Sequence, residues 1–287
     1  MYKEFNFRID NKLKHKLEIL GSQLDKKDIW ILVTGDEGSG KTNTAAYILY
    51  YFHCMTGRNF TINNFYFDAN ELFNYAKQNK CELLNWDEAA LGGLSSEWWS
   101  QSQINLIKLA ITGRKLHHIF VLCIPRFDKL KEDLRMDRIH AQIHMDCGKK
   151  NNKYGHYIYL TRRGIKYLNR MWKEKRMRVY ENAMKKCGGF AGDIPYVFDK
   201  VFTKEDQDIY ESNKDKAIYN IGNKKGSKEK QQLKDLRRRI AKVKFPIKTQ
   251  EEFAKATGIN IRYMSRWKEN PEDDEEITPH PVLTLDE

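Results

Sequence analysis

The segment Gly35–Thr42, GDEGSGKT, constrains the fold of this chain more than any other feature. It has the spacing G-x-x-x-x-G-K-T and stands between an apolar run at 29–33 and a helix-forming segment at 43–51. A glycine-rich turn between a buried strand and a helix predicts a phosphate-binding loop. In such a loop Lys41 reaches the phosphate oxygens, the Thr42 hydroxyl ligates Mg²⁺, and the helix dipole favours the anion. The candidate ATP-binding residues are Gly35, Asp36, Glu37, Gly38, Ser39, Gly40, Lys41, Thr42 and Asn43.

Paired carboxylates supply the second half of the predicted site. Leu83–Trp86 reads as a short buried strand, and Asp87 and Glu88 follow it directly. The carboxyl ends of strands in open parallel sheets bind ligands, so these side chains are expected near the loop. Asp87 is the candidate second metal residue beside Thr42, and Glu88 is the candidate that polarises the attacking water. A solvated carboxylate pair at a strand end is the alternative. An acidic residue placed to orient water favours hydrolysis over transfer to a substrate hydroxyl.

Composition narrows the classes of partner. The 287 residues carry a net charge of +12, which indicates attraction to a polyanion such as DNA. No apolar run approaches the length of a membrane span, and the N-terminus lacks an apolar signal region. The five cysteines are scattered and include no Cys-x-x-Cys pair, which makes zinc unexpected and indicates a reducing cytoplasm. We therefore expect a cytoplasmic protein without a membrane partner, in the host cytoplasm if the chain is viral.

Apolar runs alternate with helical patterns along most of the chain, which predicts an α/β fold with a mostly parallel phosphate-loop sheet flanked by helices. Further strands are expected at 60–67, 83–86, 118–124, 139–145 and 157–160, and helices at 13–24, 68–78, 97–111, 164–186 and 196–221. The expected organisation is an ATPase core at 1–160, a helical extension at 161–222, a linker at 223–230, a basic helix with a small all-α helix-turn-helix at 231–270, and a disordered acidic tail at 271–287.

The C-terminal part carries the helix-turn-helix pattern. Ala254 is followed by Gly258 four residues later and by Met264 six residues beyond that, and 261–268 is predicted to be the second helix. A purely structural helical hairpin is the alternative. The candidate DNA-binding residues are Arg262, Tyr263, Arg266 and Lys268 on that helix, with Arg237, Arg238 and Arg239 in the basic segment upstream.

Three segments together resemble a known family. Gly35–Thr42, Asp87-Glu88-Ala89 and the run GRKLHHIF at 113–120 are similar to the ATPase core of the FtsK–HerA and zonula-occludens-toxin-like group. The resemblance covers about 29–145. It implies a phosphate-loop ATPase of a virus or plasmid that pumps or packages DNA, acting as a homo-oligomeric ring.

The resemblance also implies a trans-acting arginine. In the family an arginine before a late core strand can act across a subunit boundary, which places Arg114 among the candidate catalytic residues with Lys41 and Glu88; Arg135 and Arg138 are alternatives. The chain departs from the family after that strand, where Cys123–Arg126 replaces the usual polar sensor, most often Gln.

These observations lead to one main hypothesis and two alternatives. The main hypothesis is an ATP-hydrolysing, DNA-associated motor that uses ATP and Mg²⁺ to translocate or package DNA. One alternative is a non-motor ATP-dependent switch or loader on DNA, of the kind used in partitioning, transposition or replication. The other is a small-molecule or nucleotide kinase.

Overall fold

The computed structural model describes residues 4–87, 107–110, 113–146, 154–174 and 179–223. The chain divides into two compact units, Met1–Gly222 and Asn223–Glu287. All described helices and strands belong to the first unit, apart from the last residue of its final helix. Apart from Asn223, which is the last residue of that helix, the expected linker, helix-turn-helix and acidic tail lie outside the described residues, as do Arg237, Arg238, Arg239, Arg262, Tyr263, Arg266 and Lys268.

Seven strands form one sheet in the described part of the chain, in the order β2-β3-β4-β1-β5-β6-β7. The strands from β2 to β5 in this order pair in parallel, whereas β6 and β7 are added antiparallel. Their bounds are β1 Ile29–Thr34, β2 Phe65–Tyr66, β3 Leu83–Asp87, β4 Ile119–Ile124, β5 Ala141–Met145, β6 His156–Thr161 and β7 Phe190–Asp193.

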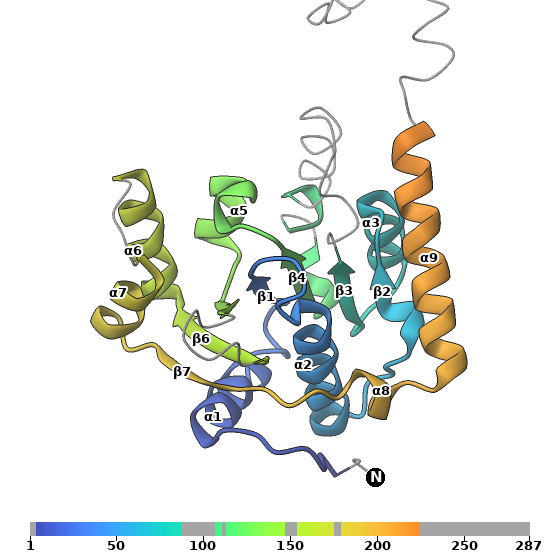
Figure 1. The fold of residues 1–287 in the computed structure, drawn as a ribbon, viewed down its shortest axis with the longest axis horizontal. Coiled ribbons are helices and arrows are strands. Elements are labelled where there is room, and N and C mark those ends of the chain that lie inside the picture. Colours follow the sequence, from blue (N-terminus) through green and yellow to red (C-terminus); the bar gives the residue numbers. More distant parts are fainter. Residues whose placement is uncertain (1–3, 88–106, 111–112, 147–153, 175–178, 224–287) are drawn as a thin grey trace, which may run out of the picture. The chain divides into compact units, whose positions relative to one another are not determined.

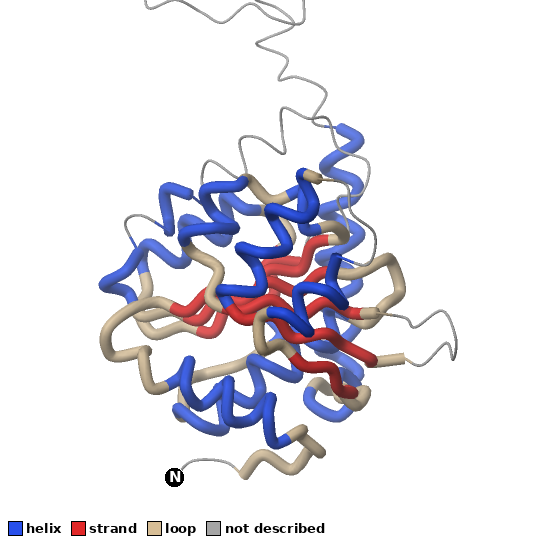
Figure 2. The backbone as a smooth tube through the Cα atoms, turned by 90° about the vertical axis from the view of Figure 1, so that its left-hand side faces the viewer, coloured by secondary structure: helices blue, strands red, loops and turns tan. Residues whose placement is uncertain are grey.

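Helices cover both faces of the sheet (Figure 2). One face packs against α1 Asn11–Gly21, α2 Lys41–Thr56, α8 Phe198–Val201 and α9 Lys204–Asn223. The other face packs against α3 Ala69–Gln78, α5 Glu132–Asp137, α6 Arg162–Lys173 and α7 Val179–Lys186. In Figure 1, α9 runs in orange beside β2 at one edge of the sheet.

Alternating side chains of the central strands supply the two cores. Ile29, Ile31 and Val33 of β1 point to the α2 face, while Trp30 and Leu32 point to the opposite face. All six residues of β1 and all six of β4 are buried. A continuous apolar run is what a central parallel strand requires, because helices cover it on both sides. This burial fixes β1, and with it the position of the segment that follows.

The α/β architecture with a mostly parallel sheet is therefore confirmed, and several expected elements recur with shifted ends. The expected strand at 60–67 is largely wrong. Only Phe65–Tyr66 is extended, and a 3-10 turn at Ile62–Asn64 precedes it. The Asn64 side chain accepts a hydrogen bond from the Thr61 backbone N–H at 2.7 Å, and this local bond favours the turn over a strand.

The expected boundary at residue 160 does not coincide with the end of the sheet. β6 continues to Thr161, and β7, which the sequence pattern did not predict, pairs with it from within the expected helical extension. Residues 161–222 and the preceding core belong to one compact unit. Of the expected helix at 97–111, only 107–110 is described, and it is helical.

Candidate functional site

The glycine-rich segment forms the connection between the C-terminal end of β1 and the start of α2. β4 lies between β1 and β3, and α2 packs across all three strands. The carboxyl ends of these parallel strands meet at one edge of the sheet, so Asp87 at the end of β3 comes close to the first turn of α2. The structure thus brings Asp87, one of the two carboxylates predicted for the second half of the site, next to the loop.

Two glycines give the loop its shape. At Gly35 a Cβ would lie 2.7 Å from the Met145 carbonyl oxygen and 2.7 Å from the Ser39 hydroxyl, so no side chain fits there. Gly40 has a φ of +92° and occupies the N-cap position of α2 in the left-handed region. Glycine adopts this conformation without steric strain. The chain can therefore turn sharply into the helix immediately before Lys41.

The side chain of Lys41 is held inside the loop. Its ammonium donates to the carbonyl oxygen of Gly35 at 2.8 Å and to that of Asp36 at 2.7 Å, and the residue is buried. A lysine ammonium has three donors. Two of them are directed to loop carbonyls in the described structure, which leaves a third for an anion in the loop.

The N-terminus of α2 is uncapped by a side chain. Gly40 makes no side-chain cap, and the first helical bond runs from the Thr44 N–H to the Gly40 carbonyl. The N–H groups of the residues in between are donors that the helix itself does not satisfy. The Ser39 hydroxyl is also buried without a hydrogen-bond partner among the described residues. Unpaired donors at a helix N-terminus beside an ammonium fit a phosphate group.

Thr42, Asp87 and Tyr210 form a compact polar cluster beside the loop. The Thr42 hydroxyl donates to Asp87 Oδ2 at 2.6 Å, and the Tyr210 hydroxyl donates to the same oxygen at 2.8 Å. The two hydroxyl oxygens are 3.4 Å apart. Burial, together with the neighbouring Asp87 carboxylate, raises the pKa of Tyr210 well above its ordinary value, so the phenol stays protonated and donates.

The sequence did not point to Tyr210. It lies on α9, 123 residues from Asp87 in the chain, and it is the only residue of that helix in the buried aromatic core described here. Its ring meets Phe65, Phe67 and Phe198 at centroid distances of 5.2–5.8 Å. No local pattern in the sequence of α9 singles out Tyr210, because the same polar helix also contains Tyr219.

Asn43 contributes to the site differently from the prediction. Its side-chain oxygen accepts from the Val197 N–H at 2.7 Å and the Phe198 N–H at 3.2 Å, and its amide donates to the Pro195 carbonyl at 3.0 Å. The side chain therefore ties the segment before α8 to the start of α2. Only the backbone N–H of Asn43 is therefore left to contact a ligand in the loop.

The predicted arginines do not join the loop of their own chain. Arg114 lies in a 3-10 turn at Gly113–Leu116, before β4 begins, whereas the loop follows the end of β1. β1 and β4 run parallel for six residues, which separates the two positions by about 20 Å. Arg135, one of the two alternatives, is buried and donates to the Phe127 carbonyl at 3.3 Å. Glu88 lies outside the described residues.

A metal ion at this site would need ligands beyond the two side chains Thr42 and Asp87. Within the described ranges, no three His, Cys, Asp or Glu residues gather into a metal-binding group. One hydroxyl and one carboxylate suit Mg²⁺, which commonly takes one or two protein ligands and completes its shell with phosphate oxygens and water.

No helix in the described part of the chain is long and apolar enough to cross a membrane.

A second polar cluster lies where β1 ends. The Thr34 hydroxyl is 3.0 Å from Nδ1 of His144 and accepts from the Gln142 amide at 3.0 Å. The His144 ring stacks on Tyr180 of α7 with centroids 3.7 Å apart. Because Thr34 directly precedes Gly35, this cluster fixes the start of the loop from the face opposite α2.

Burial makes this region sensitive to acid. It lowers the pKa of His144 and of His140 to about 4; Lys27 and Arg162 add to the effect at His140, whereas Asp146 and Asp36 oppose it at His144. An unfolded histidine titrates near 6.5, so the unfolded chain binds protons first as the pH falls. The contribution of each neutral histidine to the free energy of unfolding is therefore fully present above about pH 6.5 and is lost as the pH falls toward 4.

We expect each histidine to lower the free energy of unfolding by about 2 kcal/mol when the pH falls from 7.5 to 5. Urea unfolding at both pH values measures this, and an equal loss in His144→Asn would contradict the role given to His144.

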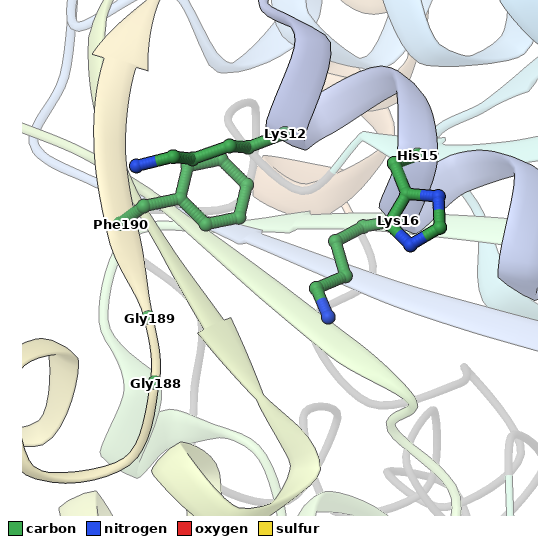
Figure 3. A pocket seen from close by; sticks show the side chains of 6 residues that line it. All are labelled: Lys12, His15, Lys16, Gly188, Gly189 and Phe190. Atoms are coloured by element: carbon green, nitrogen blue, oxygen red, sulfur yellow. The ribbon is translucent and has the colours of Figure 1, made fainter.

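A hollow of about 240 Å³ lies elsewhere on the molecule (Figure 3). Lys12, His15 and Lys16 of α1 line one side, and Gly188, Gly189 and Phe190 at the start of β7 line the other. None of these residues belongs to the loop or to the Thr42–Asp87–Tyr210 cluster. The hollow is a separate basic surface feature beside the outermost strand.

No protein-family model matches the chain, and no curated protein matches its sequence.

Proposed function

We propose that this chain binds ATP with Mg²⁺ at the loop Gly35–Thr42 and hydrolyses it. One observation carries the proposal: the Lys41 ammonium is fixed inside the loop while the Thr42 hydroxyl meets the Asp87 carboxylate at 2.6 Å. A cation, uncapped helix N–H groups and a hydroxyl–carboxylate pair are the parts that positioning and charge stabilisation of a transferring phosphoryl group require.

Each side chain has a distinct task in this proposal. Lys41 and the first N–H groups of α2 bind the phosphates, and the loop carbonyls keep the ammonium in place. Thr42 and Asp87 hold Mg²⁺, which neutralises charge on the phosphate oxygens when bound. Glu88, which follows Asp87 in the chain, is the proposed group that orients the attacking water. That assignment favours a hydrolase over a kinase.

We further propose that hydrolysis drives translocation or packaging of DNA for a virus or mobile element, in the cytoplasm. The net charge of +12 and the basic residues of the C-terminal unit support a DNA partner. A homo-oligomeric ring is part of the proposal: Arg114 lies before β4 begins, at the opposite end of that strand from the loop, and in a ring it would act at the site of a neighbouring subunit.

The test is ATP hydrolysis by the full chain with and without duplex DNA, run beside sizing in ATP. Phosphate release that rises when DNA is added supports the proposal. Displacement of a triplex-forming strand then separates a motor from a switch that only binds and releases DNA. Phosphate transfer to an added nucleotide, without release to water, would instead identify a kinase.

The tyrosine beside the metal residues gives a further prediction. Tyr210→Phe removes the hydroxyl that orients Asp87 but keeps the ring that packs on Phe65 and Phe198. Loss of such an outer hydrogen bond typically weakens a metal site about 10-fold or more. We expect the Mg²⁺ concentration for half-maximal turnover to rise by about that factor. An unaltered Mg²⁺ titration would show that Tyr210 only fills space.

A further inference from the structure

Two exposed tyrosines lie together near the loop. Tyr154 and Tyr196 expose 46% and 47% of their surface, in contrast with the buried aromatic cluster around Tyr210. Their rings meet edge to face, with centroids 5.9 Å apart and planes at 65°. Water contact is unfavourable for so much aromatic surface, so the pair is suited to cover a flat apolar ligand.

The backbone holds both tyrosines in place. The residue after Tyr154 is Gly155, whose carbonyl accepts from the Ile194 N–H at 2.8 Å. A Cβ at Gly155 would lie 2.2 Å from the Ile194 carbonyl oxygen, so this close approach of the two loops needs glycine. Asn43 binds Pro195 and Val197, the residues on either side of Tyr196. The start of α2 therefore fixes the position of Tyr196.

Tyr154 also borders the loop itself. A Cβ built on Gly40 would lie 3.0 Å from both Cζ and the hydroxyl oxygen of Tyr154. Gly40 directly precedes Lys41, the residue that binds the phosphates in the proposal above. One tyrosine thus lies against the loop and the other against the first turn of α2.

We propose that Tyr154 and Tyr196 form the surface on which the base of the bound nucleotide stacks. This inference rests on the proposed nucleotide binding. With the β-phosphate inside the loop, the ribose and base extend from the α-phosphate beyond the start of α2, the part of the molecule that these two rings border. Every base presents a π-face, and stacking on an aromatic ring is a recurrent source of affinity that tolerates base identity.

Stacking also predicts which nucleotides bind. A purine covers more of an aromatic surface than a pyrimidine does, because it has two fused rings. Adenine and guanine have similar stacking area. The pair therefore favours purine nucleotides over pyrimidine nucleotides and contributes little to the choice between ATP and GTP.

The experiment separates base from phosphate. Calorimetry measures the affinity of the full chain for ADP, CDP and pyrophosphate, each with Mg²⁺. Tyr154→Ala and Tyr196→Ala are expected to lower the affinity for ADP about 5- to 150-fold, to leave pyrophosphate unchanged, and to abolish the preference for ADP over CDP. Phenylalanine at either position should retain wild-type affinity. Tyr219→Ala, which removes an exposed tyrosine of α9 away from the loop, is the matched control.

The outcomes distinguish this inference from the function on which it rests. If the alanine variants bind ADP as the wild type does, the stacking surface is wrong while nucleotide binding stands. If the variants lose affinity for ADP and for pyrophosphate equally, the tyrosines stabilise the loop and do not contact the base, and the inference also fails. If the wild type binds neither compound, the proposed nucleotide site fails and the stacking surface fails with it.

Discussion

We expect Lys41→Ala to lower ATP turnover by at least about a hundredfold, the loss typical of removing one preorganised group that stabilises charge in a transition state. The carbonyl oxygens of Gly35 and Asp36 hold the ammonium in place, so the substitution removes a cation that is already positioned in the loop. Phosphate release at saturating ATP and Mg²⁺ measures the effect.

A matched control distinguishes loss of this group from loss of charge in general. Lys204→Ala removes an exposed lysine at the start of α9 that pairs with Asp208 at 3.1 Å. Exposed pairs contribute little, so turnover and thermal midpoint should stay at the wild-type values. Retention of more than about a tenth of wild-type turnover in Lys41→Ala would refute the phosphate-loop assignment.

The part of the site that the sequence predicted is determined by residues close to one another in the chain. The glycines at 35 and 40 and the lysine at 41 act over a few neighbouring residues, so their spacing in the chain is enough to predict the loop. The meeting of Asp87 with Thr42 also follows, because parallel strands place their carboxyl ends at one edge. Apolar runs predicted the two buried strands that lead to these residues, β1 without interruption and β3 with Asn85 in its middle.

The remaining part depends on contacts between distant segments. Tyr210 reaches Asp87 only because α9 packs on the aromatic residues near β2, and no local pattern encodes that contact. The role of Asn43 was missed for the same reason, since its partners lie 152–155 residues away. The strand β7 is four residues long and contains Gly192, which gives it little strand propensity; pairing with β6 determines it.

Asp87→Asn is expected to have an effect comparable to that of Lys41→Ala. Asparagine keeps the size of the side chain and one oxygen that accepts from Thr42 and Tyr210, but it removes the negative charge that a divalent cation requires. We expect Mg²⁺-dependent turnover to fall about a hundredfold, with a thermal midpoint close to the wild type. Asp208→Asn, on an exposed face of α9, is the matched control and should leave Mg²⁺-dependent turnover unchanged.

The double variant Asp87→Asn with Tyr210→Phe tests whether the tyrosine acts through the carboxylate. If Tyr210 only orients the charged Asp87 oxygen that it shares with Thr42, its removal has no further effect once that charge is gone. The two losses would then be strongly non-additive, as is usual for residues in one hydrogen-bond network. Additive losses would instead mean that Tyr210 affects the phosphate loop independently of Asp87. Mg²⁺ titrations of turnover for the wild type, both single variants and the double variant complete the cycle.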